Sequence, residues 1–338
     1  MKAFRRCREA FIALGGAGAA AGPHLCAPMP AIDFSALLPA GPLGPDGAAG
    51  GARGRLLASL VRWPNLLIML LSLALVRVGL LLPGQVGALL APRFGLLVLS
   101  ALLVAAAGYI INDYYDVKID AINRPDRLVV GRVVRRRTAM LAHLVLSGTG
   151  VALAAFLSPL LGSVTLGAAA LLWGYSARFK RVALVGNVSI GALTAALVLL
   201  PELQLRTGNV VVWRYALAAF LLTVVREIVK DVEDMHGDAQ HGCRTLPLVA
   251  GVARTKWVAG FFLACLGVLT GGAAAWLAVH GPWSLAAWLG ALVLLPLGAL
   301  ARLLVLADRR HHFRQLSTWC KGIMLAGVLS MALAGGVG

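Results

Sequence analysis

The stretch FGLLVLSALLVAAAGYIINDYYDVKID, residues 94–120, joins a long apolar run to a cluster of aspartates. A helix that crosses a membrane needs about 20 mainly apolar residues, and residues 94–112 meet that length. The rest of the chain is similar: 59% of its 338 residues are hydrophobic and 13% are charged, whereas soluble domains have roughly 25% charged residues. The composition therefore predicts an all-α polytopic membrane protein and excludes a soluble fold.

Apolar segments of this kind recur along the chain. Their spacing predicts nine membrane-spanning helices, at 64–83, 94–112, 137–157, 159–176, 182–201, 210–229, 255–279, 284–306 and 319–337. Lys and Arg gather on the cytoplasmic side of membrane proteins. With nine spans, 27 of the 31 Lys and Arg residues fall on one side. We therefore expect a cytoplasmic N-terminus and an external C-terminus, and we attribute the net charge of +17 to topology and not to nucleic-acid binding.

The N-terminal region, residues 1–55, differs from the rest of the chain. It is rich in Gly, Ala and Pro and has few aromatic residues, so it cannot bury enough surface to offset the entropy of ordering. We expect it to be disordered, followed by one membrane domain at 56–338. The five cysteines are scattered without paired spacing, which predicts neither a disulfide framework nor a structural zinc site.

Acidic residues are scarce and unevenly placed. Nine of the fourteen lie in two windows at the cytoplasmic ends of the second and sixth segments, where ionisable groups are costly unless paired or functional. The windows contain Asp113, Asp116, Asp120 and Asp126, then Glu227, Asp231, Glu233, Asp234 and Asp238.

Each window contains three aspartates at i, i+3 and i+7, namely 113, 116 and 120, and 231, 234 and 238. This spacing places the three carboxylates on one face of a helix, where they repel unless cations share them. Mg²⁺ prefers oxygen ligands and is usually held by one or two carboxylates together with substrate phosphates. A solvated helix end neutralised by arginines would explain one triplet. Two matching triplets favour a diphosphate bridged by Mg²⁺ to both stripes.

Several short motifs in the chain resemble those of a known family. Residues 112–120, NDYYDVKID, match the N-D-x-x-D-x-x-x-D motif of UbiA-type intramembrane prenyltransferases, and residues 231–238 are similar to their second aspartate motif. Further similar elements are RWPN at 62–65, NRPDR at 123–127, and Tyr175-Ser176 followed by Lys180 and Arg181. The resemblance covers about residue 60 to the end.

The resemblance implies a helical fold around a cavity open to the lipid, with both motifs holding Mg²⁺ and a prenyl diphosphate on the cytoplasmic side of the cell (inner) membrane. It implies metal ligands and catalytic residues at Asp113, Asp116, Asp120, Asp231, Asp234 and Asp238, with Asn112 as a further ligand. It implies substrate binding by Asn65, Asn112, Arg124, Arg127, Tyr175 and Lys180. One departure is Leu128-Val129-Val130-Gly131-Arg132, where the family often has Pro-x-x-Ser-Gly-Arg, so this loop and Arg132 carry no assigned role.

The second motif, KDVEDMHGD at 230–238, followed by GCRTLP at 242–247, most resembles the branch that makes digeranylgeranylglyceryl phosphate. The resemblance implies transfer of a prenyl group to geranylgeranylglyceryl phosphate, and geranylgeranyl is the prenyl group that we expect. Related strings occur in branches with aromatic or chlorin acceptors (quinone, tocopherol or chlorophyll pathways), and that alternative stays open. Nothing in the sequence indicates an obligate protein partner.

Prenyl transfer develops positive charge on the prenyl carbon, which an aromatic face can stabilise. Tyr109, Tyr115, Trp173 and Tyr175 are candidates, although aromatics are also common at membrane interfaces. A different class of function, a transporter with an acidic ion site, would need access from both sides. It is disfavoured because Glu202 is the one clear acid on the external side. Glu227 could assist the aspartates or pair with a nearby arginine.

Overall fold

Helices account for nearly all of the described chain because a backbone in lipid must satisfy its own hydrogen bonds. The computed structural model describes residues 60–123 and 129–335, and within α4 it describes no side chain beyond residue 117. The predicted disordered extension, 1–55, lies outside these residues, as do Arg124 and Arg127. In the described ranges there is no β-strand, only two isolated bridges, Val130 with Val134 and Val182 with Arg244.

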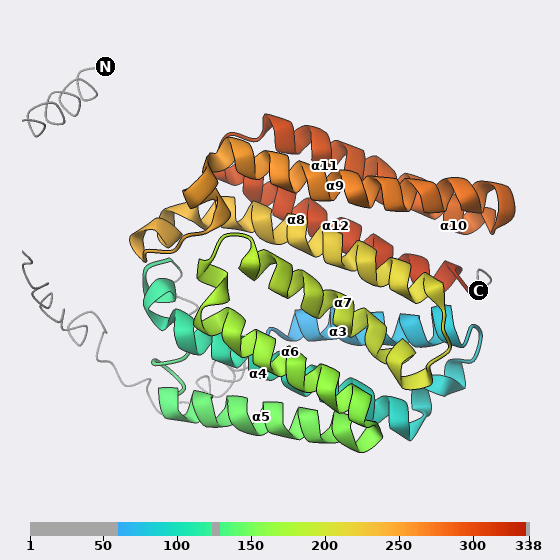
Figure 1. Cartoon of the computed structure of the whole chain (residues 1–338), viewed down its shortest axis with the longest axis horizontal. Helices are drawn as coiled ribbons and strands as arrows, with labels where there is room; N and C mark the ends of the chain where they lie inside the picture. The colour runs from blue at the N-terminus through green and yellow to red at the C-terminus, as the bar shows by residue number, and fades with distance from the viewer. Residues whose placement is uncertain (1–59, 124–128, 336–338) are drawn as a thin grey trace, which may run out of the picture. The chain divides into compact units, whose positions relative to one another are not determined.

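The first half of the domain comprises α3 to α7 (Figure 1). Helix α3, Trp63–Leu75, continues as a π-helical turn, Val76–Leu81. A short 3₁₀ turn, Val86–Leu90, leads to α4, Pro92–Asn123. Then follow α5, Arg136–Leu157, α6, Pro159–Ala177, a 3₁₀ turn at Phe179–Arg181, and α7, Val185–Leu205.

The second half comprises α8 to α12. Helix α8, Val210–Gln240, precedes α9, Leu246–His280. Helix α10, Trp283–Trp288, a π-helical turn, Leu289–Leu294, and α11, Leu295–Leu306, form the next span. The last helix is α12, Arg310–Ser330, which ends in a 3₁₀ turn, Met331–Leu333.

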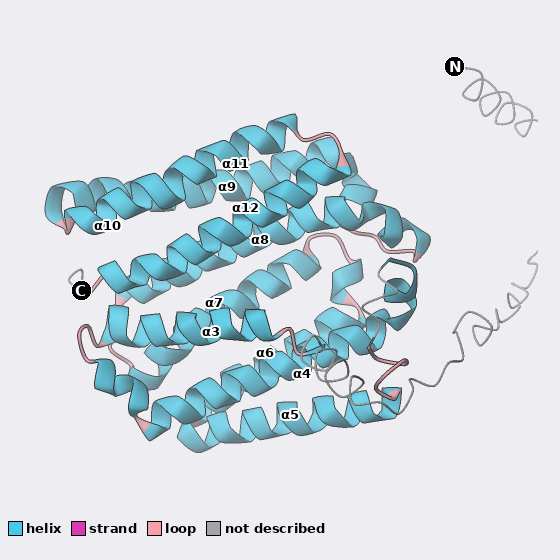
Figure 2. Cartoon of the chain, turned by 180° about the vertical axis from the view of Figure 1, so that it is seen from behind, coloured by secondary structure: helices cyan, strands magenta, loops and turns pink. Residues whose placement is uncertain are grey.

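Packing brings the two halves together beside α3. Helix α4 packs on α5 and α6, and α8 packs on α7, α9 and α12. Helix α3 contacts α4, α7 and α12, so it lies between the halves, as the view from behind shows (Figure 2). One buried cluster spans α8 to α12, and a second, including Leu73, Leu97 and Leu161, joins α3 to α4 and α6.

Eight of these helices, or runs of helices, are long and apolar enough to cross a membrane. They correspond to eight of the nine predicted segments, with ends that differ by up to nine residues. The sixth segment, 210–229, forms most of α8, which has 31 residues but is not among the eight. Its apolar part includes Arg214 and Arg226 and ends beside Glu227, so it is less apolar than the others.

Two helices begin nine residues before the predicted segments, α9 at Leu246 and α12 at Arg310. The extra turns contain basic residues, which lower hydropathy without preventing helix formation. In α9 the backbone kinks at Gly251, where φ is 80°. Helix α4 has 32 residues and is therefore about 48 Å long. It exceeds the roughly 30 Å hydrocarbon core, so the turns that carry the aspartates extend past the apolar segment.

Candidate active site

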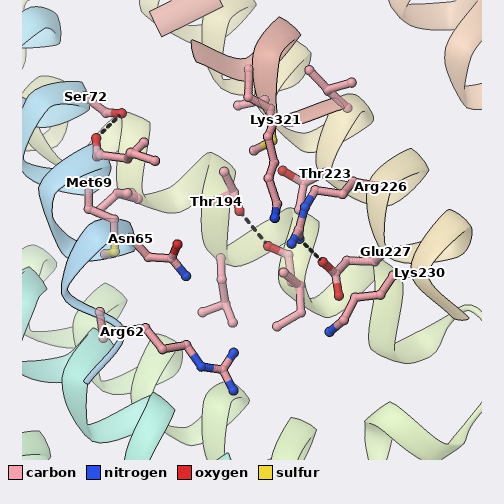
Figure 3. Close-up of a pocket in the computed structure, with 18 of the residues that line it drawn as sticks. Arg62, Asn65, Met69, Ser72, Thr194, Thr223, Arg226, Glu227, Lys230 and Lys321 are labelled. Carbon is pink, nitrogen blue, oxygen red and sulfur yellow. Dashed lines mark hydrogen bonds and ion pairs between the residues drawn. The ribbon is translucent and has the colours of Figure 1, made fainter. Parts of the chain in front are cut away.

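A cavity of about 1850 Å³ lies among α3, α4, α6, α7, α8 and α12, with α9 and the turn Leu289–Leu294 completing its wall (Figure 3). Its wall is charged near the C-terminal ends of α4 and α8 and mainly apolar elsewhere. The apolar part includes Ile68, Met69, Val104, Leu193, Leu222 and Val293. The cavity can therefore hold a molecule with an ionic head and a long hydrocarbon tail.

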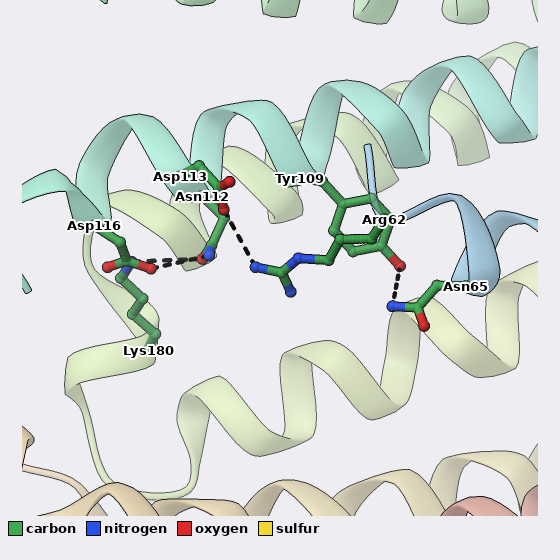
Figure 4. Close-up of polar contacts among 7 residues, drawn as sticks. All are labelled: Arg62, Asn65, Tyr109, Asn112, Asp113, Asp116 and Lys180. Carbon is green, nitrogen blue, oxygen red and sulfur yellow. Dashed lines mark hydrogen bonds and ion pairs between the residues drawn. The ribbon is translucent and has the colours of Figure 1, made fainter. Parts of the chain in front are cut away.

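The first aspartate motif lines the cavity from α4 (Figure 4). Asn112 donates from Nδ2 to Oδ2 of Asp116 at 2.9 Å, and Lys180 forms an ion pair with the same carboxylate. The Nη2 of Arg62 lies 3.2 Å from Oδ1 of Asp113. The backbone of Asp120 continues the helix, but its side chain lies outside the described part. Two carboxylates of this motif are therefore each held by a cation.

The position of Lys180 depends on two loops that are distant in sequence. The backbone N–H of Arg244, after α8, donates to the carbonyl of Arg181 at 2.8 Å. On the other side, Gly186 of α7 packs against this turn so closely that a Cβ would lie 2.9 Å from the Cα of Lys180. These contacts hold the lysine over the first motif and beside the end of α8.

The second motif lines the same cavity from α8, where Asp231, Asp234 and Asp238 form one stripe. Asn187 of α7 donates from Nδ2 to Oδ2 of Asp231 at 2.7 Å. Burial, with a contribution from Glu227, raises the pKa of Asp231 to about 7 despite that hydrogen bond. Burial and the charges of Asp234 and Asp116 raise the pKa of Asp238 to about 6. The two motifs are thus close enough for their charges to interact.

The carboxylates fit a hard divalent cation only in part. All of their donors are oxygens, as Mg²⁺ prefers, and the raised pKa values show that the pocket would gain from added positive charge. Among the described residues, however, no three Asp, Glu, His or Cys side chains lie close enough to hold one ion. This arrangement fits Mg²⁺ that takes one or two protein ligands and completes its coordination with phosphate oxygens and water.

The remaining residues that the sequence suggested for the site fall into two groups, those that line the cavity and those that do not. Asn65 and Tyr175 line the cavity, and Asn65 donates to the hydroxyl of Tyr109, which is also on the wall, at 3.2 Å. Tyr115 and Trp173 are not on the wall, and Trp173 is 53% exposed. Interface aromatics and cavity aromatics cannot be separated by composition, because only the rotation of each helix decides where a ring points.

Glu227 forms the expected ion pair with Arg226. It also lines the cavity, and its charge acts on Asp231, so both roles considered for it have a structural basis. Sequence reasoning missed several residues on the wall. Arg62 was part of a quoted motif without an assigned role, and its guanidinium also lies 5.0 Å from the ring centre of Tyr109. The other missed wall residues are Thr223, Arg226, Lys230, Arg310, Arg314 and Lys321. Asn187, which supports Asp231 without lining the cavity, was missed as well; a polar residue in the apolar segment 182–201 was the available signal for it.

Comparison with known proteins gives a consistent result. The UbiA prenyltransferase family model matches residues 66–324. The chain is 38% identical over 196 residues to a digeranylgeranylglyceryl phosphate synthase of Methanospirillum hungatei JF-1. It is 39% identical over 179 residues to one of Pyrococcus abyssi. The matched stretches span 57% and 53% of this chain and 67% and 62% of those relatives.

Solved structures share the fold. One described as giving insights into the biosynthesis of "Digeranylgeranylglyceryl phosphate synthase in membranes" matches 84% of this chain and 99% of its own, with 24% identity and a TM-score of 0.67. A UbiA homolog from Archaeoglobus fulgidus bound to GPP and Mg²⁺ matches 82% of this chain and 99% of its own, with 18% identity and a TM-score of 0.58.

These findings confirm the predicted enzyme class over the transporter alternative. The family model spans most of the chain, and the chain forms helices long and apolar enough for an integral membrane protein. The chain belongs to the UbiA prenyltransferase family.

Proposed function

We propose that the protein transfers a geranylgeranyl group from its diphosphate to geranylgeranylglyceryl phosphate, with Mg²⁺, and releases diphosphate. The observation that carries the proposal is the cavity, in which two aspartate motifs and Lys180 surround a charged end that continues into an apolar chamber. Such a cavity matches the two parts of a prenyl diphosphate. The relatives named as digeranylgeranylglyceryl phosphate synthases support the acceptor.

Ionisation of the allylic carbon–oxygen bond is the step that the charged end must assist. Mg²⁺, when bound, supplies Lewis-acid stabilisation of the leaving diphosphate. The residues that would hold it are Asn112, Asp113, Asp116, Asp120, Asp231, Asp234 and Asp238. Lys180 lies at Asp116 and places fixed positive charge where the leaving group gains negative charge. Arg124 and Arg127, which follow α4 in the sequence, add to this charge in our proposal.

The prenyl carbon becomes positive as the diphosphate leaves, and the apolar chamber excludes water that would otherwise capture it. Tyr109, to which Asn65 donates a hydrogen bond, and Tyr175 line the cavity and offer aromatic faces to the cation. The acceptor hydroxyl then forms the new carbon–oxygen bond and gives up its proton to the released diphosphate or to water. An aromatic or chlorin acceptor remains the alternative substrate of the same chemistry.

We further propose that the catalytic domain, 56–338, crosses the membrane nine times. The eight spans described above are joined by α8, which is the sixth crossing in chain order. The excess of Lys and Arg on one side of that count supports a cytoplasmic N-terminus and an external C-terminus. The site would then open to the cytoplasmic face of the cell membrane, where its water-soluble product, diphosphate, is released. The cavity would admit prenyl and acceptor chains from the lipid.

The test is transfer of labelled geranylgeranyl by the purified full chain in liposomes. Geranylgeranylglyceryl phosphate and aromatic acids compete as acceptors, with Mg²⁺ or with EDTA. We expect Mg²⁺-dependent product on the phosphate acceptor. Asp116→Asn and Asp234→Asn should each lower the rate by about 10²- to 10³-fold, because each removes a carboxylate that would hold the Mg²⁺ that stabilises the leaving diphosphate.

Asp308→Asn is the matched control, since Asp308 is an exposed carboxylate that pairs with Lys256 outside the cavity. It should keep wild-type activity. Product formed only on an aromatic acid would contradict the phosphate acceptor and support the alternative acceptor. Product that does not depend on Mg²⁺ or on the aspartates would contradict the mechanism.

A further inference from the structure

A second group of charged residues on the cavity wall is basic and comes from α8 and α12. Its members are Arg226 and Lys230 on α8 and Arg310, Arg314 and Lys321 on α12. Within the described ranges, Arg226 has an ion pair, with Glu227, whereas Lys321 has none. The groups whose charges act most strongly on Lys321 are Arg226 and Lys230, ahead of Glu233 and Glu227. This part of the wall therefore has an excess of positive charge.

Thr223 is an independent sign that a ligand is missing here. It lies one turn before Arg226 on α8 and lines the cavity, and 2% of its surface is exposed. Its hydroxyl has no hydrogen-bond partner among the described residues. A buried hydroxyl without a partner costs roughly 1–3 kcal/mol. Figure 3 shows Thr223, Arg226 and Lys321 at the same wall.

These groups match the needs of a phosphate. A phosphate monoester carries close to two negative charges and three acceptor oxygens. Lys offers three N–H donors, Arg offers five, and a threonine hydroxyl offers one. An anion bound here would relieve the repulsion between Lys321 and Arg226 and would also provide a partner for Thr223.

The position of this group relative to the aspartates is also informative. Arg226 and Asp234 are eight residues apart on α8, which corresponds to about 12 Å along the helix axis. The aspartates with their cation suit one anion, the diphosphate, and the basic group suits another. Two anionic substrates repel at short range, so a separate positive site is required if both are to bind in one cavity.

We propose that Thr223, Arg226 and Lys321 form the subsite for the phosphate monoester of the acceptor lipid. The inference rests on the proposed function, and it deepens it by assigning the acceptor's head group to one wall of the cavity. Lys230, a member of the basic group, follows Arg226 by four residues and directly precedes Asp231 on α8, so in this proposal it separates the two anion sites. Its charge acts on Asp231, Asp238 and Lys321.

The test measures acceptor binding and turnover separately in the full-length protein. Binding of geranylgeranylglyceryl phosphate is titrated calorimetrically in EDTA without prenyl donor. Turnover is measured with saturating donor and Mg²⁺, and the acceptor concentration is varied. We expect Lys321→Gln to weaken acceptor binding and raise the acceptor KM by about 10- to 100-fold, as for a lost charged hydrogen bond. The KM for the prenyl diphosphate should not change.

Three variants make the result specific. Thr223→Val, which keeps the shape, should raise the acceptor KM in the same direction, and Lys321→Arg should restore most of the binding. Arg254→Gln removes one exposed positive charge from α9 outside the cavity and should have no effect. For wild type, geranylgeranylglycerol, which lacks the phosphate, should bind as weakly as the phosphate acceptor binds to Lys321→Gln.

The outcomes separate this inference from the proposed function. Lys321-dependent binding of the phosphate acceptor without turnover would support the subsite and contradict the function. Turnover of the phosphate acceptor with unchanged KM in Lys321→Gln and Thr223→Val would overturn the subsite alone. A rise in the KM for the prenyl diphosphate, with the acceptor KM unchanged, would place these residues at the donor site. That result would also overturn the acceptor subsite. Absence of acceptor binding to wild type would also overturn it.

Discussion

Asn187 of α7 donates a hydrogen bond to Asp231 of α8 across 2.7 Å, and Asn187 is buried, with 5% of its surface exposed. The bond fixes the carboxylate from a neighbouring helix, so it positions a member of the second aspartate motif without touching substrate. Sequence patterns within α8 give no indication of this support.

Replacement of Asn187 should therefore affect Asp231. In Asn187→Ala we expect the Mg²⁺ dependence of transfer to shift to about 10- to 100-fold higher concentration, as is typical when a residue that orients a metal ligand is lost. Activity titrated with Mg²⁺ measures this shift. Ser189→Ala is the control on the same helix, because its hydroxyl donates to Val185 of α7 itself. An unchanged Mg²⁺ titration in Asn187→Ala would show that the hydrogen bond has no role in metal binding.

Lys180 provides fixed charge beside Asp116, and its removal should act mainly on the chemical step. Lys180→Met should lower kcat by about 10²- to 10³-fold, comparable to the loss of one electrostatic donor at a developing negative charge. Single-turnover rates with labelled prenyl diphosphate report that step. Arg178→Met removes an exposed neighbouring cation that does not line the cavity, and it should behave as wild type. Equal losses in both variants would indicate a general charge effect.

The second motif should make the metal-free protein sensitive to pH. The pKa values of Asp231 and Asp238 are raised to about 7 and about 6, while an unfolded aspartate titrates near 3.8. Between these values the folded protein binds more protons than the unfolded chain, so stability rises as pH falls. In EDTA, the thermal midpoint should increase as pH is lowered from 8 to 5.

A double variant, Asp231→Asn with Asp238→Asn, tests the source of this dependence. It should be more stable than wild type at pH 8 and should show a flatter pH profile. Mg²⁺ with a prenyl diphosphate analogue should raise the wild-type midpoint at pH 8, because a ligand that binds only the folded state stabilises it. A wild-type midpoint that falls steadily from pH 8 to pH 5 would contradict the assignment.

Gly79 allows the first and last spans to approach closely. A Cβ at this position would lie 2.3 Å from the backbone carbonyl oxygen of Met331, which cannot move aside as a side chain can. Gly79→Ala should therefore destabilise the fold by about 1–3 kcal/mol, as overpacking typically does. Gly298→Ala is the control, since a Cβ there meets nothing within 4 Å. Denaturation of both variants in the same detergent gives the comparison, and equal stabilities would exclude a tight contact.

The aspartate stripes illustrate what a local pattern can predict. The spacing of 113 and 116, and of 231, 234 and 238, depends only on the helical repeat, so it correctly anticipates carboxylates along α4 and α8 facing one cavity. The predicted starts of α9 and α12 lie nine residues after the observed ones. Charged residues such as Arg254 and Arg310 lower the hydropathy that marks a segment, but they do not prevent a helix from forming.

Thr223, Asn187 and Lys321 illustrate the opposite case. Each is a polar residue in a mainly apolar segment, and the average hydropathy of the segment hides it. Whether such a residue faces the cavity or a neighbouring helix depends on how its own helix is rotated, and packing against other helices decides that rotation. Tyr115 and Trp173, which do not line the cavity, could not be separated from Tyr109 and Tyr175 by sequence for the same reason.

By itself the sequence determined the membrane character, the positions of most helices and the two carboxylate stripes, because these follow from composition and from the helical repeat along one segment. Only the tertiary structure decided that Asn187 supports Asp231, that the Arg244 and Arg181 backbones join two loops to hold Lys180, and that α12 contributes Lys321 to the cavity. These relationships join helices that are far apart in the chain. They depend on side-chain packing between helices, which no periodicity within one segment encodes.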